Sequence, residues 1–456
     1  MPVASPANYR HILARTLFGF SALDYEKAMG YGSLESLVDQ AILAPIPLPA
    51  PPNAWVSLTP AQAQQDSGDA GRWYTELTQW WNKRMYTQGL NMQEKIVLFL
   101  HSHFACERDK VNYPQHMYQQ NQLFRKFAFG NFKQLVKEIS IDPTMLIYLD
   151  GNNSRGSAPN ENYGRELLEL FTIGIGNYSE NDVKQAAKAL SGYQVRGLTV
   201  TYDPARSYTN ASLTILGKTA KFNVNTLVDL IFEQKQTAEF ICRKIYQNFV
   251  YYKADEVFVK KMADVFRANN YELKPLFRFL LLSDEFYKPT ILASRIKNPQ
   301  ELMIGALKVL QIPTPDWANV DALSRMLQLQ LFQPPDVAGW PGQREWISST
   351  TYSHRGGFTD SLLSGKRYNG ANVTGKINAL AYARTFSTSE KAVAFVNQLI
   401  DLFILFPISD AKRSFLLETM LEGTIAANWS TNTAQADVRI LRLLKAMMRM
   451  PEFQLN

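Results

Sequence analysis

Polar and charged side chains are concentrated in residues 160–169, whose sequence is NENYGRELLE. In a helix over this stretch, three-and-four spacing places Asn162, Glu166 and Glu169 on one stripe. Two carboxylates one turn apart can bind a hard cation, or they can divide into a general acid and a general base when their environments differ. We therefore expect Glu166 and Glu169 to be catalytic residues or ligands of a divalent metal, the cofactor that the sequence suggests.

The neighbouring residues extend this candidate catalytic site. Asn160 is a good N-cap, and Glu161 interacts favourably with the dipole of the helix that it opens. Arg165 shares a stripe with Glu161 and could hold an anionic group, while Tyr163, on the apolar side, is a candidate for substrate binding. Asp150 begins the polar loop that precedes the helix. The alternative is structural: a buried Arg–Glu network or a solvated face would tie the loop down, and judged alone this is the more common explanation.

Two histidines, His101 and His103, lie near the end of an apolar stretch, residues 93–107. Histidines at i and i+2 chelate one metal readily from a strand or an unwound helix end, but on a regular helix they point roughly 200° apart. At most one would then face a shared site, and we expect His103, with Glu166 and Glu169, as the metal ligand. Either histidine could instead act as a catalytic acid, or be a core residue hydrogen-bonded to a carbonyl or a glutamate.

A loop rich in proline, glycine and tryptophan occupies residues 333–347, QPPDVAGWPGQREWI. Prolines fix the backbone and glycines allow tight turns, and Trp340 and Trp346 offer flat stacking faces on either side of Arg344. Such a loop suits a sugar or peptide groove in which these three residues bind the substrate. It could equally plug one end of a helical domain.

The pattern along the chain predicts a mainly α, multi-helix globular domain. Apolar residues recur at helical spacing in residues 7–20, 33–43, 72–88, 93–107, 114–129, 131–140, 161–173, 180–193, 224–234, 236–249, 255–269, 273–285, 298–310, 319–331 and 375–455. Ser179 is the expected N-cap of the helix at 180–193, with Asp182 in the capping-box position. Residues 195–222 break the pattern and predict a small β-hairpin insertion that pairs Leu198–Tyr202 with Leu213–Leu216.

Composition divides the chain into four parts. Residues 1–43 are N-terminal helices, and residues 44–71 form a Pro-, Ala- and Gln-rich stretch whose composition favours an extended connector. Residues 72–357 form the helical core that carries the motifs described above. Residues 358–456 form a C-terminal helical part packed on this core.

Composition and charge exclude several classes of protein. The 456 residues are 46% hydrophobic, and 48 basic against 41 acidic residues give a formal net charge of +7. No basic stripe with interleaved aromatics is present, so no nucleic-acid partner is expected. Two cysteines exclude a disulfide-rich scaffold, and with five histidines a metal site must rely on carboxylates. No apolar stretch reaches the ~20 residues that cross a bilayer and no signal peptide is evident, which predicts a cytoplasmic protein without a transmembrane segment.

Four ordered motifs resemble those of a bacterial family catalogued as domain of unknown function 1800, over essentially the full length. The family patterns HLLxRAxFG, FWHNHF, NENYARELMELFTLGxGxYTExDV and PPNVAGWPGGxxWI are matched in order by residues 10–19, 99–104, 160–183 and 334–347. In the last motif, Asp336 and Gln343 are substitutions. The resemblance implies a mainly helical fold and supplies no established activity.

The resemblance also implies a partner. Members of this family are often encoded beside proteins of a second unknown-function family, number 1501, which resemble sulfatases and alkaline phosphatases and often look exported. A periplasmic or cell-envelope location, reached with such a sulfatase-like protein, is therefore expected as the alternative to the cytoplasm.

Two functions of different classes follow. The first is an enzyme, a hydrolase or transferase acting on a glycan or an ester, in which one of the two histidines and the polar residues of 150–169 converge on a pocket with Trp340 and Arg344 at its rim. The second is a non-catalytic helical partner that docks, stabilises or helps to export the sulfatase-like protein. The sequence contains no Walker loop, HExxH or GxSxG motif that would decide for a known chemistry.

Overall fold

The computed structural model describes residues 2–65, 70–208, 211–366, 368 and 375–456. The first helices are α1 (Pro6–Thr16), α2 (Ala22–Met29), α3 (Leu34–Leu37), α4 (Pro60–Gln65), α5 (Ala70–Thr87), α6 (Gln93–His103), α7 (Arg108–Val111), α8 (Pro114–Phe127), α9 (Phe132–Ile139), α10 (Pro143–Tyr148), α11 (Glu161–Glu166) and α12 (Glu180–Ala189). They are followed by α13 (Val224–Glu233), α14 (Lys235–Phe249), α15 (Glu256–Ala268), α16 (Leu273–Leu281), α17 (Pro299–Val309), α18 (Trp317–Met326), α19 (Ser349–Ser364), α20 (Ala379–Ala383), α21 (Ala392–Phe403), α22 (Asp410–Leu421) and α23 (Ala436–Arg449).

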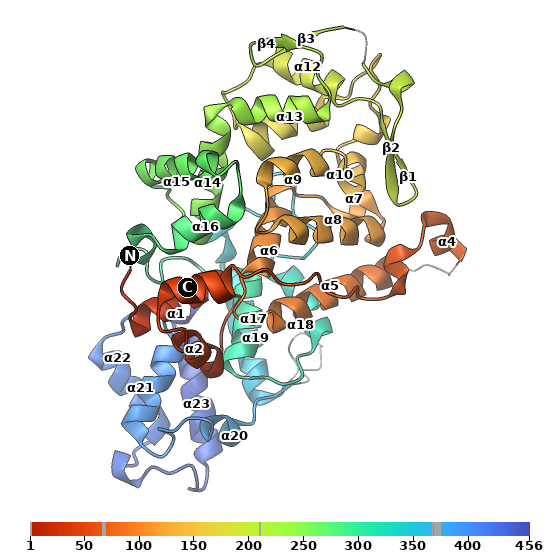
Figure 1. Ribbon diagram of the computed structural model, residues 1–456. Helices are drawn as coiled ribbons and strands as arrows, with labels where there is room; N and C mark the ends of the chain where they lie inside the picture. Colours follow the sequence, from red (N-terminus) through yellow and green to blue (C-terminus); the bar gives the residue numbers. More distant parts are fainter. Residues whose placement is uncertain (1, 66–69, 209–210, 367, 369–374) are drawn as a thin grey trace.

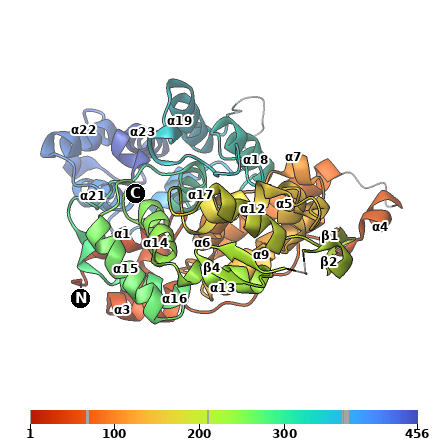
Figure 2. The same cartoon turned by 90° about the horizontal axis from the view of Figure 1, so that it is seen from above.

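The prediction of a mainly helical protein with a small β element is confirmed. Helices α12 and α13 and the strands lie at one end of the molecule, helices α20–α23 lie at the other, and α6 and α17 lie between them (Figure 1). In the view from above, strands β1 (Tyr193–Arg196) and β2 (Thr199–Tyr202) and helix α4 lie towards one edge of the molecule (Figure 2). The first helix lies close to the C-terminal part of the chain: Arg10 of α1 is 3.9 Å from Asp401 of α21.

The β element consists of two separate antiparallel hairpins. Strands β1 (Tyr193–Arg196) and β2 (Thr199–Tyr202) form one, and β3 (Leu213–Ile215) and β4 (Lys218–Ala220) form the other. The predicted pairing of Leu198–Tyr202 with Leu213–Leu216 is therefore wrong. Gly197 and Gly217 have φ angles of 62° and 79°, which suit two-residue hairpin turns, so each strand pairs with its neighbour in sequence.

Helix α6 is the buried element on which the site is built. All of its residues except Ser102 are buried, as its nearly uniform apolar character predicts. Its carboxylate Glu94 accepts hydrogen bonds of 2.8 Å from Nε and Nη2 of Arg125 on α8, and one of 2.9 Å from Nε1 of Trp81 on α5. These bonds satisfy the buried charge and fix the position of α6 between its neighbours.

The helix starts predicted from capping residues are confirmed. Asn160 caps α11 by accepting from the amide of Asn162, and Ser179 with Asp182 forms the capping box of α12. Helix α11 then continues as η4 (Leu167–Thr172), a π-helix whose wider turns change the spacing of the residues after Glu166.

Among its described residues, the Pro-, Ala- and Gln-rich interval 44–71 contains two short helices, η2 (Ala54–Ser57) and α4, and the start of α5. Within it, Trp55 is buried and stacks on Trp73 of α5 at a ring-centre distance of 5.6 Å. Across the part of the chain that the structure describes, no helix combines the length and the apolar character that crossing a membrane requires.

Candidate functional site

A cleft lies between the C-terminal half of α6, the end of α14 and the loop at residues 338–343. Its outer part has a volume of about 300 Å³ and is lined by Phe99, Ser102, His103, Lys244, Gln247, Asn248, Tyr252, Ala338, Trp340, Pro341, Gly342 and Gln343. Its inner part, of about 70 Å³, shares six of these residues and adds Lys95, Leu98, Arg295, Asn298, Glu301, Leu329 and Trp346. The two parts therefore adjoin, and both are called the cleft below.

The tryptophan loop is held against α6 by a close backbone approach. A Cβ atom on Gly339, whose φ is 87°, would lie 2.1 Å from the carbonyl oxygen of Ser102. The next amide, that of Trp340, donates to Ser102 Oγ at 3.3 Å. On the other wall, Gln343 Nε2 donates to the carbonyl of Gln247 at 2.8 Å, which ties the loop to α14. Glycine is required at 339 because only its bare backbone fits this contact.

His103 and Lys244 line the outer part of the cleft, and both are anchored by carbonyls of the π-helix η4. His103 Nε2 lies 3.0 Å from the carbonyl oxygen of Phe171, and Lys244 Nζ donates to that of Leu170 at 3.1 Å. Because a carbonyl can only accept, Nε2 carries the proton of the imidazole, and Nδ1 is left as a buried acceptor without a partner among the described residues.

Burial sets the protonation of both groups. It holds the pKa of His103 well below its usual range, and the nearby Lys244 ammonium lowers it further. Burial also lowers the pKa of Lys244 to about 8. His103 is consequently a neutral hydrogen-bonding group, whereas Lys244 can exchange a proton near neutral pH.

The inner part of the cleft is charged. The carboxylate of Glu301, 2% exposed, is bound to the ammonium of Lys95, and its Oε1 lies 3.6 Å from Nη1 of Arg295. Its Oε2 accepts from the amide of Asn298 at 2.7 Å, within the capping box of α17. Burial lowers the pKa of Lys95 to about 8, while the ammonium of Lys95 and the guanidinium of Arg295 hold the pKa of Glu301 at about 2.

The polar helix singled out in the sequence does not line this cleft. Arg165 donates to both carboxylate oxygens of Glu180 at 2.7 and 2.8 Å and lies 3.6 Å from Glu161. Glu169 accepts from the Tyr178 hydroxyl. These contacts match the structural explanation given for this segment, an Arg–Glu network that ties it down. The network lies at the surface.

Glu166 is half-buried, and burial together with the neighbouring Glu169 raises its pKa. The expected metal ligands His103, Glu166 and Glu169 are not gathered: among the described residues, no group of three or more His, Cys, Asp or Glu side chains could hold a metal ion. Instead, His103 is bonded to a carbonyl and Glu169 to a tyrosine.

Three further sequence candidates have local partners. Asp150 has a φ of 59° and accepts from Lys110 Nζ at 2.9 Å on the surface. Asn160 caps its helix, and the buried Tyr163 donates its hydroxyl proton to Ser140 Oγ at 2.7 Å.

The remaining candidates from the sequence are His101 and the residues of the tryptophan loop. His101 points away from His103, as its spacing predicts, and its Nε2 accepts from the amide of Phe332 at 3.2 Å. Burial lowers the pKa of His101 to about 3. Trp340 lies at 5.5 Å from the His101 ring and lines the cleft with Trp346, while Arg344 stacks on Tyr252 at 5.3 Å. The loop therefore forms one wall of the cleft.

Sequence reasoning missed the cationic residues Lys95, Lys244 and Arg295. Helical spacing alone treats Lys244 as part of a solvated face. Lys95 could have been identified from the sequence, because it lies on a stretch predicted to be buried nearly all round and a buried lysine needs a partner.

Comparison with known proteins gives one match. A family model described as "Protein of unknown function (DUF1800)" matches residues 11–455. Neither the curated proteins nor the solved structures contain a match to this chain.

Proposed function

The chain belongs to the DUF1800 family of proteins of unknown function, and we propose that it is an enzyme, a hydrolase or transferase for a glycan or an ester, with the cleft as its active site. The main support is that His103 of α6 and Lys244 of α14 both line the outer part of the cleft and are both held by carbonyls of η4. Groups that are costly to bury are assembled more often where they act than elsewhere.

In this proposal, Lys244 is the catalytic acid–base. A lysine whose pKa is about 8 exists as both ammonium and amine near neutral pH, so it can take a proton from an attacking hydroxyl or water and return it to a leaving group. The carbonyl of Leu170 holds its Nζ in place at 3.1 Å.

His103 has a different role, because a neutral imidazole with a strongly lowered pKa is a weak base. It would shape the outer part of the cleft beside Lys244, with its ring fixed by the carbonyl of Phe171. Trp340 and Tyr252 would provide apolar faces for a sugar ring in the outer part of the cleft.

The test is turnover of a panel of 4-nitrophenyl esters and glycosides, neutral and acidic, by the wild type and by matched lysine variants. We expect Lys244→Met to lower kcat/KM by roughly 10²–10⁴-fold, the usual contribution of a general acid–base. Lys261→Met, on the exposed face of α15, should leave kcat/KM unchanged.

Full turnover by a folded Lys244→Met variant would contradict the proposal. Absence of turnover on the whole panel would count against an enzyme and favour the non-catalytic partner. Stoichiometric co-purification with a co-expressed sulfatase-like protein would then support that second function.

A further inference from the structure

The inner part of the cleft has the chemistry of an oxyanion pocket. We propose that the substrate carries a carboxylate, sulfate or phosphate group and that Arg295, with Lys95 beside it, binds this group in the inner part of the cleft. This inference rests on the proposed function, because it assigns a class of substrate to the same cleft.

Arg295 is a buried guanidinium whose donors are not all used. Its side chain is 6% exposed, and its Nε and Nη1 atoms make no hydrogen bond within the described residues. Buried donors that stay unpaired are costly, roughly 1–3 kcal/mol each and more when charged. A planar guanidinium binds an oxyanion through one edge with two parallel N–H···O bonds, so such a ligand in the inner part of the cleft would pair with Arg295 and compensate its charge.

At this end of the cleft, positive charges outnumber negative charges. Lys95 and Arg295 provide two cations, and Glu301 provides the carboxylate that both of them contact. Arg15, fully buried nearby, adds a further repulsive cation to Arg295. Glu301 is shared between Arg295, Lys95 and the Asn298 amide, so a second anion in the cleft would compensate the excess positive charge.

The space is adequate for such a group. The inner part measures about 70 Å³, and one water requires only about 10–15 Å³ on this scale, so several ligand atoms fit beside Arg295. Asn248 and Gln343, which line both parts, could bind hydroxyls next to the anion, and Trp346 closes the wall.

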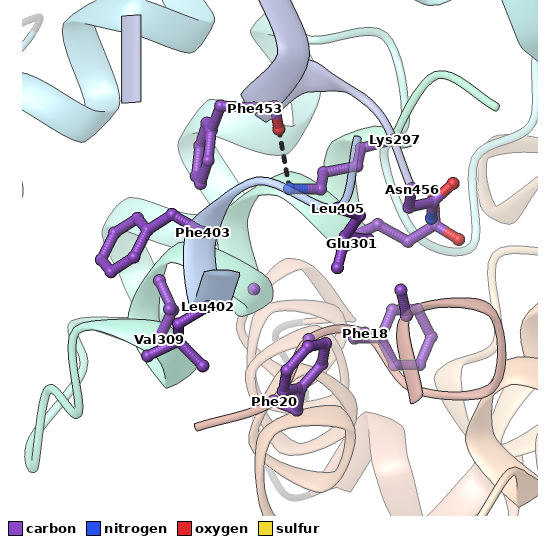
Figure 3. Close-up of a pocket in the computed structure, with 13 residues that line it drawn as sticks. Phe18, Phe20, Lys297, Glu301, Val309, Leu402, Phe403, Leu405, Phe453 and Asn456 are labelled. Carbon is purple, nitrogen blue, oxygen red and sulfur yellow. Dashed lines mark hydrogen bonds between the residues drawn. The ribbon is translucent and has the colours of Figure 1, made fainter. Parts of the chain in front are cut away.

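A second cavity, which Glu301 also lines, provides a contrast (Figure 3). It measures about 40 Å³ and is lined mainly by apolar residues, among them Phe20, Leu402 and Phe403. Its cation, Lys297, already donates to the carbonyl of Phe453 at 2.7 Å and lies 4.1 Å from the centre of that ring. Among the described residues that line it, this cavity therefore shows no unpaired donor like those of Arg295.

The inference is tested by calorimetric titration of the full chain with sulfate, phosphate and acetate at constant ionic strength. We expect one saturable site for at least one of these ions, and the ion that binds most tightly identifies the group. Arg295→Gln should weaken this binding at least tenfold. Arg196→Gln, which removes an exposed arginine on β1, should leave it unchanged.

A second variant keeps the test valid if Arg295→Gln fails to fold. Asn248→Leu fills the cleft from the half-buried face of α14 and should also weaken binding at least tenfold. Absence of binding for all three ions, or full binding by the folded variants, would overturn the inference. Lys244→Met separates the two proposals: it should lower kcat/KM by the roughly 10²–10⁴-fold given above but retain oxyanion binding, so either can fail while the other holds.

Discussion

At the residue scale, burial rather than residue type gives Lys244 its lowered pKa. Its ammonium is half-buried against the Phe240 ring, 5.0 Å from its centre, and no carboxylate among the described residues contributes to its pKa. Burial also makes His101 and His103 neutral. The pKa values of these two histidines and of Lys244 are therefore lower than those of the free side chains.

The pKa of Lys244 can be measured without a substrate. Acylation by acetic anhydride requires the free amine, and burial penalises the ammonium, so the rate at Lys244 should rise with pH and be half-maximal near pH 8. An ordinary lysine reacts half-maximally near its usual pKa of about 10.4. Peptide mass spectrometry over pH 6–11 would follow Lys244, with the exposed Lys261 as the reference in the same sample. A half-maximal rate near pH 10 at Lys244 would contradict the assignment.

At the scale of elements, the π-helix η4 connects the polar helix to the cleft. Residues 161–166 form the α11 surface that contacts Glu180, and the following π turn presents the carbonyls of Leu170 and Phe171 to Lys244 and His103. The acidic residues of this motif thus act locally, whereas its backbone holds the side chains of the cleft. Short π segments in helices are frequent at functional sites.

The loop that closes the cleft provides a matched pair of glycine variants. Gly339→Ala would place a Cβ 2.1 Å from the Ser102 carbonyl, whereas at Gly342, with a φ of 74°, the nearest atoms are 4.0 Å away. Both substitutions strain a left-handed backbone, but only the first forces the loop off α6. We expect Gly339→Ala to lower the free energy of unfolding by about 1–3 kcal/mol more than Gly342→Ala.

Urea unfolding of the two variants would measure this difference. Equal losses of stability would mean that the contact between Gly339 and Ser102 is not what holds the loop in place.

At the scale of the whole molecule, Glu301 joins distant parts of the chain. Its carboxylate binds Lys95 of α6 and lies beside Arg295, whose backbone pairs with that of Asn456. It also interacts electrostatically with Arg15 of α1 and with Arg355 of α19. Removing this charge would leave several buried cations without their shared carboxylate.

We therefore expect Glu301→Gln to lower the free energy of unfolding by about 3–5 kcal/mol, the cost of breaking a buried ion pair. Glu256→Gln removes a carboxylate from an exposed pair with Arg243 and should cost no more than ~1 kcal/mol. Chemical denaturation at pH 7 compares them. Similar costs for the two variants would show that the buried network contributes little to stability.

The sequence by itself determined the features that depend on neighbouring residues. Helical periodicity predicted the mainly helical fold, Asn160 and Ser179 marked helix starts by their capping chemistry, and the i, i+2 spacing predicted that His101 and His103 diverge. The motif pattern also identified the family that the chain belongs to. Strand pairing was not determined, because an alternating segment does not specify its partner.

Only the tertiary structure decided where the candidate site lies. The cleft brings together Lys95, Lys244, Arg295 and Trp340, which are separated by dozens of residues and lie on different elements. The pKa values of Lys95 and Lys244 depend on their burial and their partners, neither of which is encoded locally. The dense polar motif at 160–169 was the strongest chemical signal in the sequence, yet its side chains bind one another and nearby residues, because tertiary packing directs its backbone rather than its carboxylates to the cleft.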